Sequence, residues 1–243
     1  VLDTETQICN HSHLRSIQYT MHTTSPLVLI SMSLLIGGAF LAAWSHARTT
    51  PSAHSTSETT PVTPANPTMN TQLKATGYTP APEVKLQTAL FGAGCFWGVE
   101  AKFRETKGVV ATGVGYAGGK VDNPTYKQVC ADTTGHAEVV QVQFDPGMIS
   151  YEELLDIFWT SHNPTTLNRQ GPDFGSQYRS ALFYYDDAQT QAAEKTKQLL
   201  AASGVWGQKP IVTFIEPAPK FYIAEDYHQQ YLEKRGLSTC HTP

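Results

Sequence analysis

Several features that would place this chain in a familiar class are missing from its sequence. No block of Lys and Arg could follow a phosphate backbone, and 17 basic residues stand against 21 acidic ones, so nucleic acid is not an expected partner. Cysteine is scarce: four residues spread over 243 positions are too few for a disulfide scaffold. They also lack the paired spacing of a zinc site, so no metal is expected. Because neither a disulfide scaffold nor a zinc site is expected, the four cysteines are expected to have individual roles.

The first part of the chain contains an uncharged run. Residues 1–25 are a polar extension, in which Met21 offers another start of translation. The run Pro26–Trp44 is long enough to cross a bilayer, and Ser45-His46-Ala47 is a small-x-small pattern that signal peptidase accepts. Residues 26–47 are therefore expected to be a signal peptide or a membrane anchor. The expected location is the cell envelope or periplasm.

Two observations keep other interpretations of this segment open. Residues 21–25 carry no Lys or Arg, unlike a standard signal peptide, and a buried core helix in a cytoplasmic protein is the alternative. Residues 48–82 are rich in Thr, Ser and Pro, and such a composition cannot bury enough apolar surface to offset its ordering entropy. We expect this stretch to be a disordered linker between the apolar segment and a catalytic domain at 83–243.

The pattern of residues 83–243 predicts one domain of mixed secondary structure. Segment 118–137 is expected to be a long loop rather than a crossover helix, and the clean alternation of 138–144 predicts a half-buried strand. Strands and helices otherwise alternate, which favours an α+β two-layer sandwich with a mixed sheet and a ferredoxin-like core. Strands are predicted at 87–92, 109–116, 138–144, 180–185 and 211–215, and helices at 96–106, 151–161 (capped by Ser150), 187–202 and 224–234.

The stretch Gly92–Gly98 carries the strongest chemical signal. Its first two glycines release the backbone from a strand and place Cys95 in the first turn of a helix. The unpaired N–H groups and the helix dipole favour a thiolate there, and the thiolate is the nucleophilic form. The alternative is a buried cysteine that acts as a small hydrophobe. The strand–glycine–helix context favours the nucleophile.

Six motifs together resemble the A-type peptide methionine sulfoxide reductases, from about Leu86 to Leu232. They are GCFWGVE, GYAGG, NPTY, TTGHAEVVQVQFDP, SHNPTTLNRQGPDFGSQYRSALFYY and AEDYHQQYL. The resemblance implies an oxidoreductase that repairs oxidative damage by reducing methionine S-sulfoxide in proteins and free methionine S-sulfoxide. It further implies no bound cofactor, thioredoxin or another dithiol as electron donor, oxidised proteins as partners and a monomeric catalytic domain.

The resemblance also assigns roles to the residues near the thiol. Cys95 matches the nucleophile that ends as a sulfenic acid, and Phe96 and Trp97 match the pocket for the substrate methyl group. Glu138 matches the acid that protonates the sulfoxide oxygen. The oxygen is a poor leaving group until protonated, so a carboxylic acid with a raised pKa is needed. Glu138 follows a glycine-rich loop, and we expect it at the sheet edge facing Cys95, the alternative being a solvated acid at a strand end.

The resemblance assigns roles to four other residues, and three of them also have an ordinary structural interpretation. Tyr126 and Tyr178 match phenols that hydrogen-bond the sulfoxide oxygen, but would otherwise be core or loop aromatics. Asp173 matches an acid at the rim that orders water or substrate, and would otherwise be a turn residue. Cys240 matches a recycling cysteine that attacks the sulfenic acid. Cys130 lies in an apparent strand and is expected to be structural.

Two other function classes compete with the reductase. A Cys–His amidase or protease would pair Cys95 with His136, His162 or His228, and would turn over without a reductant. We expect His136 to order its loop instead. A binding module for exposed methionines would be indifferent to Cys95→Ser. Cys9 precedes the apolar segment and receives no role.

Overall fold

The computed structural model describes residues 72–237, which belong to one compact unit. The apolar segment 26–47, its polar extension, Cys9 and Cys240 lie outside the described residues. Ordered structure begins before the predicted domain boundary at 83. The strand β1 (Lys74–Ala75) pairs with β3, and the Thr76 side chain donates to the carbonyl of Val110 at 3.1 Å. The end of the predicted linker is therefore part of the domain.

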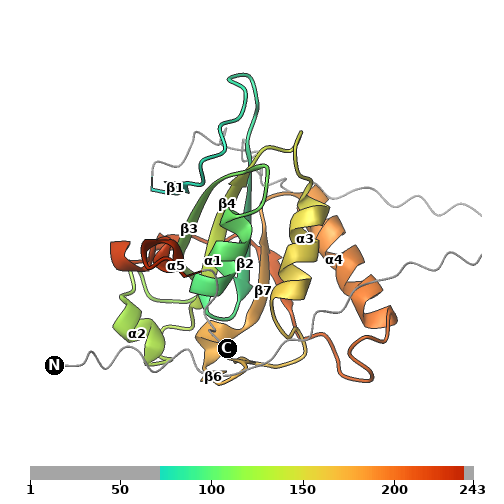
Figure 1. The fold of residues 1–243 in the computed structure, drawn as a ribbon. Coiled ribbons are helices and arrows are strands. Elements are labelled where there is room, and N and C mark those ends of the chain that lie inside the picture. The colour runs from blue at the N-terminus through green and yellow to red at the C-terminus, as the bar shows by residue number, and fades with distance from the viewer. Residues whose placement is uncertain (1–71, 238–243) are drawn as a thin grey trace, which may run out of the picture. The chain divides into compact units, whose positions relative to one another are not determined.

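A single mixed sheet forms the centre of the domain (Figure 1). Its strand order is β1-β3-β4-β2-β7-β8, with β9 also pairing with β3. Only the β7–β8 pair is parallel among the strands described in this sheet. Besides β1, the strands are β2 (Gln87–Ala93), β3 (Val109–Ala117), β4 (Ala137–Phe144), β7 (Ser180–Tyr184), β8 (Phe214–Pro217) and β9 (Tyr222–Ile223).

Three helices form a second layer against this sheet (Figure 1). They are α1 (Phe96–Arg104), α3 (Tyr151–Ser161) and α4 (Asp187–Ala202). The predicted cap of α3 is confirmed, because the Ser150 side chain accepts from the Glu153 N–H and Glu153 bonds back to the Ser150 N–H. The succession β2-α1-β3-β4-α3-β7, with β4 between β2 and β3, is the split β-α-β arrangement expected of a ferredoxin-like core.

The strands bury side chains on both faces of the sheet. Val140 and Val142 belong to the main core beneath the helices, whereas Val139 belongs to a second cluster that includes Phe183 and contacts Phe221. The strand predicted at 138–144 is confirmed, but its predicted half-burial is wrong: all eight residues of β4 are buried because β4 is an inner strand covered on both sides.

The connecting segments differ from the predictions in three places. The loop 118–137 contains the short helix α2 (Tyr126–Cys130), and the last predicted strand is shifted to β8. The predicted helix 224–234 is broken, because Gln230 adopts a left-handed conformation with φ +50°. It becomes the 3₁₀ turn η2 (Asp226–His228) and the helix α5 (Tyr231–Lys234). The remaining elements are β5 (Arg169–Gln170), β6 (Asp173–Phe174) and the 3₁₀ turn η1 (Ser176–Tyr178).

Candidate active site

Cys95 lies where the chain passes from β2 into α1, as predicted. Gly94 connects the two with φ +86°, and a Cβ there would come within 2.6 Å of the Gln170 Cγ, so only glycine fits without strain. Cys95 is the N-cap residue of α1 and is partly exposed. Its sulfur is therefore reachable, and it sits at the positive end of a nine-residue helix that favours the thiolate.

Glu138 lies beside the same helix end. Its Oε2 atom accepts a hydrogen bond from the N–H of Phe96 at 3.1 Å, and the residue is only 2% exposed. Because Phe96 directly follows Cys95, the carboxyl group binds the backbone next to the residue that carries the thiol. The expectation that Glu138 faces this turn holds, but its strand is an inner one and not a sheet edge. Its burial also excludes the solvated alternative.

Three tyrosines lie near enough to be influenced by the charge of this carboxyl group. Burial raises the pKa of Tyr126 and Tyr178 far above the usual value, and the charge of Glu138 adds to both shifts. The charges of Asp173 and Cys95 raise the pKa of Tyr178 further. Tyr116, which pairs with Glu138 across the β3–β4 ladder, is raised in the same way. All three phenols remain protonated at neutral pH and can donate hydrogen bonds.

Trp97 forms an aromatic wall next to Cys95. Its ring stacks on Tyr231 of α5 with the centroids 3.7 Å apart and the planes 3° from parallel. Its Nε1–H donates to Nδ1 of His228 at 3.0 Å. The Phe96 ring lies 5.1 Å from the His228 ring and 6.5 Å from Trp97. The indole is thus held by a stacking partner and by a hydrogen bond.

His228 is a part of the site that the sequence did not identify as a partner of Trp97. The residue is 1% exposed, and burial lowers its pKa to about 4, so the ring is neutral at pH 7. Because Nδ1 accepts from Trp97, the ring proton is on Nε2. That Nε2 atom is therefore a buried donor without a partner among the residues described.

The segment before α5 holds the surrounding backbone in place. The Glu225 carboxylate accepts from the Tyr126 N–H at 2.9 Å and from the Tyr116 hydroxyl at 2.8 Å. The side-chain amide of Gln229 accepts from the Val114 N–H and donates to the Val114 carbonyl, both at 2.9 Å. The Gln229 side chain thus makes the two hydrogen bonds to Val114 that the backbone of a neighbouring strand would otherwise make. The sequence indicated only a mixed polar helix here.

Cys130 does not lie in a strand, contrary to the prediction. It is the last residue of α2 and is exposed. The Tyr126 hydroxyl interacts with its thiol, and the charge of Glu138 reaches both groups. Cys130 therefore belongs to the surroundings of the site and not to the core.

The other two candidate histidines are occupied by structural hydrogen bonds. His136 accepts from the Gly119 N–H at 3.0 Å and bonds the Val121 carbonyl at 2.8 Å, which confirms that it orders its loop. His162 is buried between the Phe158 carbonyl and the Ser180 hydroxyl. Neither arrangement is that of a base prepared for Cys95, so the Cys–His hydrolase loses two of its three candidates.

Two further features are absent from residues 72–237. No group of three or more His, Cys, Asp or Glu side chains in this range could hold a metal ion. No helix in the same range is long and apolar enough to span a membrane.

Comparison with known proteins places this geometry in a family. Residues 87–243 match the family model for peptide methionine sulfoxide reductase. The chain is 57% identical over 162 residues to the peptide methionine sulfoxide reductase MsrA of Methanoculleus marisnigri, which covers 67% of this chain and 98% of the relative. Identity to the MsrA of Geobacter metallireducens is also 57%, over 64% of this chain and 96% of that protein.

Solved structures agree with the sequence comparison. Reduced Mxr1 from Saccharomyces cerevisiae is similar with a TM-score of 0.60 and 40% identity, over 68% of this chain and 91% of that one. Methionine sulfoxide reductase A of Corynebacterium diphtheriae gives a TM-score of 0.56 and 42% identity, over 62% and 76%. The chain therefore belongs to the peptide methionine sulfoxide reductase family.

Proposed function

We propose that this protein reduces methionine S-sulfoxide in proteins to methionine, with Cys95 as the nucleophile and Glu138 as the proton donor. One observation carries the proposal: Cys95 is at the N-terminus of a helix, and the buried Glu138 carboxyl group accepts a hydrogen bond from the N–H of the residue that follows it, Phe96. A thiolate attacks sulfur well only if the departing oxygen is protonated. This arrangement places a nucleophile and a potential acid at one turn of backbone.

The first half of the reaction consumes the sulfoxide. The Cys95 thiolate attacks the sulfoxide sulfur, and the oxygen takes a proton from Glu138 and is transferred to Cys95 as a sulfenic acid. Methionine leaves as the thioether, so the substrate sulfur is reduced and the cysteine sulfur is oxidised by two electrons. The protonated phenols of Tyr126 and Tyr178 stabilise the charge that develops on the oxygen.

Substrate binding relies on the aromatic wall and the polar rim. Phe96 and Trp97 bind the methyl group of the sulfoxide, because contact between the methyl group and these aromatic rings removes apolar surface from water. Asp173 is close enough to influence Tyr178 and orders water or substrate at the rim. The free Nε2–H of His228 adds a donor behind the wall. No bound cofactor is needed for any of these roles.

The second half of the reaction regenerates the thiol. Cys240, which lies outside the described residues, attacks the sulfenic acid and releases water as a disulfide with Cys95 forms. A thioredoxin-type dithiol then reduces that disulfide. The family resemblance and the position of Cys240 three residues beyond the described chain support this assignment.

One assay tests the proposal against its competitors. The protein is mixed with a methionine sulfoxide peptide, with and without dithiothreitol, and methionine and free thiols are followed. A reductase stops after one turnover without dithiothreitol and consumes thiols in step with methionine formed. Hydrolysis that needs no reductant would support the amidase, and binding without product would support the methionine-binding module.

We further propose that the catalytic domain functions outside the cytoplasm. The uncharged run Pro26–Trp44 and the Thr/Ser/Pro-rich linker after it support export. A reporter that works only in the cytoplasm, fused after Asn70, should be silent. An active reporter together with a soluble cytosolic protein would support the cytoplasmic alternative.

A further inference from the structure

The helix that carries Tyr231 cannot hold its position alone. α5 has only four residues, and a helix this short is not stable in isolation. Leu232 is 2% exposed and provides an apolar contact. Lys234 donates to the Asp226 carbonyl at 2.8 Å, but Asp226 belongs to the same C-terminal segment. Just before α5, Gln230 donates from Nε2 to the Ala75 carbonyl at 3.0 Å and Gln229 bonds Val114, so the start of the helix is attached to the sheet and its C-terminal end needs another contact.

Arg104, at the end of α1, supplies a polar attachment. Its Nη1 atom lies 3.3 Å from Oε2 of Glu233 in α5, and its Nη2 atom lies 3.6 Å from Oε1 of Glu105. The Arg104 side chain is only 12% exposed, so its charge is poorly screened by solvent. The same helix begins with Phe96 and Trp97. Arg104 therefore joins the two helices on either side of the aromatic stack.

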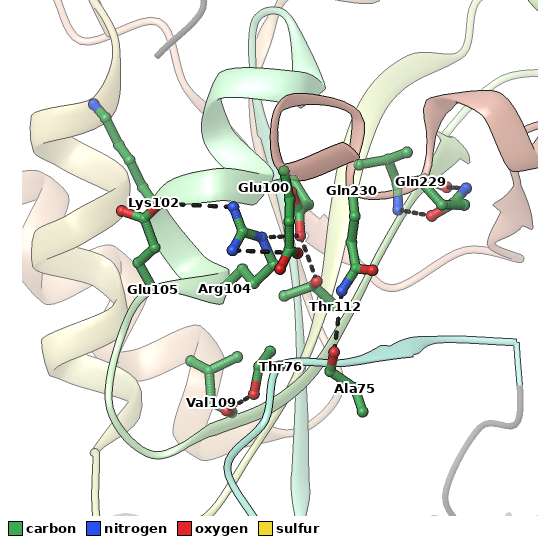
Figure 2. A network of polar contacts seen from close by, with 12 residues as sticks. Ala75, Thr76, Glu100, Lys102, Arg104, Glu105, Val109, Thr112, Gln229 and Gln230 are labelled. Atoms are coloured by element: carbon green, nitrogen blue, oxygen red, sulfur yellow. Dashed lines mark hydrogen bonds and ion pairs between the residues drawn. The ribbon is translucent and has the colours of Figure 1, made fainter. Parts of the chain in front are cut away.

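A buried carboxylate fixes the guanidinium group from the other side. Oε1 of Glu100 lies 3.4 Å from Nε of Arg104 and accepts from the Thr112 hydroxyl at 2.7 Å (Figure 2). The Glu100 side chain is 2% exposed, and a buried charge without its partner is strongly unfavourable. Arg104 is thus kept close to Glu100 and presents a guanidinium group of defined position to α5.

We propose that Arg104 is a positioning residue for the substrate pocket. Through Glu233 it fixes α5, and α5 in turn holds the Tyr231 ring flat against Trp97. The orientation of Trp97, and with it the fit of the substrate methyl group, then depends on an ion pair that does not touch the substrate. This inference rests on the proposed function, because it assigns Trp97 to the sulfoxide pocket.

Two exposed carboxylates provide a matched test. Glu233 and Glu105 have side chains 53% and 57% exposed, and each pairs with Arg104, but only Glu233 lies in α5. Pre-reduced full-length protein is mixed with N-acetyl-methionine sulfoxide without reductant, and N-acetyl-methionine from the first turnover is measured against substrate concentration. Glu233→Gln should raise the half-saturating concentration about two- to fivefold, with a limiting rate within about twofold of the parent protein. Glu105→Gln should leave both values unchanged.

A second variant and a second readout guard against a general loss of fold. The double variant Glu100→Gln with Arg104→Gln removes the link to α5 without leaving a lone buried charge, so it should reproduce the Glu233→Gln shift. With 5-fluorotryptophan incorporated, the ¹⁹F resonance of Trp97, assigned by Trp97→Phe, should move in Glu233→Gln and stay in place in Glu105→Gln.

The outcomes separate the two proposals. If the parent protein forms no N-acetyl-methionine, the proposed function fails. If it is active, but Glu233→Gln matches Glu105→Gln in half-saturation and in the Trp97 resonance, Arg104 does not act on the pocket. A lower limiting rate at unchanged half-saturation would also overturn the proposal.

Discussion

Acidification should destabilise this protein through His162. The ring is buried at the end of α3, where Nδ1–H donates to the Phe158 carbonyl at 2.9 Å and Nε2 accepts from the Ser180 hydroxyl at 2.6 Å. Burial lowers its pKa from 6.5 to about 4. A proton on Nε2 would place a charge in this buried site and reverse the bond with Ser180, whose oxygen also bonds the Thr213 hydroxyl at 2.7 Å.

The sign and size of the effect follow from proton linkage. Between pH 6.5 and about 4 the unfolded chain binds a proton at His162 that the folded protein does not bind, so stability is present above pH 6.5 and is lost as the pH falls. With those two values, lowering the pH from 7.5 to 5 costs about 2 kcal/mol at this one residue. Burial also lowers the pKa of His228 to about 4, which acts in the same direction.

A variant that cannot titrate isolates the contribution of His162. Urea unfolding of the parent protein and of His162→Gln is measured at pH 7.5 and pH 5, and the parent should lose about 2 kcal/mol more than the variant. The variant will be less stable at pH 7.5, but only the difference between the two pH values is compared. An equal loss in both proteins, or an NMR titration of His162 near pH 6.5, would refute the reasoning.

Three predictions concern the chemistry. Cys95→Ser should abolish sulfoxide reduction even with excess dithiothreitol, and residual activity above a few per cent would contradict its role as nucleophile. Glu138→Gln should lower the single-turnover rate by roughly 10²- to 10⁴-fold, because the variant loses the proton donor. Its amide oxygen can still accept from the Phe96 N–H, so the local structure is kept. A loss of rate below about threefold would show that Glu138 has only a structural role. Cys240→Ser should complete one turnover but should not be recycled by thioredoxin. Mass spectrometry of the parent protein after one turnover should show a Cys95–Cys240 disulfide. A Cys95–Cys130 disulfide instead would mean that Cys130, and not Cys240, is the resolving residue.

The sequence predicted well whatever depends on neighbouring residues. Hydrophobic periodicity located α3 to the residue, a composition of strong helix formers located α4 to the residue, and the Ser150 cap follows from local chemistry. The two glycines before Cys95 predicted its place at the helix start, because a strand can turn into a helix there only with a residue that tolerates a positive φ.

The predictions failed where contacts between distant residues decide the structure. Residues 224–234 have the composition of a helix, but the Gln229 side chain hydrogen-bonds Val114, 115 positions earlier, and Gln230 takes a left-handed conformation. The partner of His228 is Trp97, 131 positions away, so no local pattern could reveal it. The strand predicted around Cys130 is wrong because Thr125 and Gln128 form a capping box that starts a helix there, a signal that local sequence does carry.

The end of α5 sets a length scale for regeneration of the enzyme. Gly236, with φ +65°, closes the helix: its N–H donates to the Glu233 carbonyl, and the Leu237 N–H donates to the Leu232 carbonyl, both at 2.9 Å. Three further residues lead to Cys240, and an extended chain of that length spans at most roughly 11 Å. In the proposed recycling step, the resolving thiol is therefore tethered within a small sphere around the helix end. If Cys95 lies outside that sphere, the cap must open first, and its two hydrogen bonds become part of the barrier to disulfide formation.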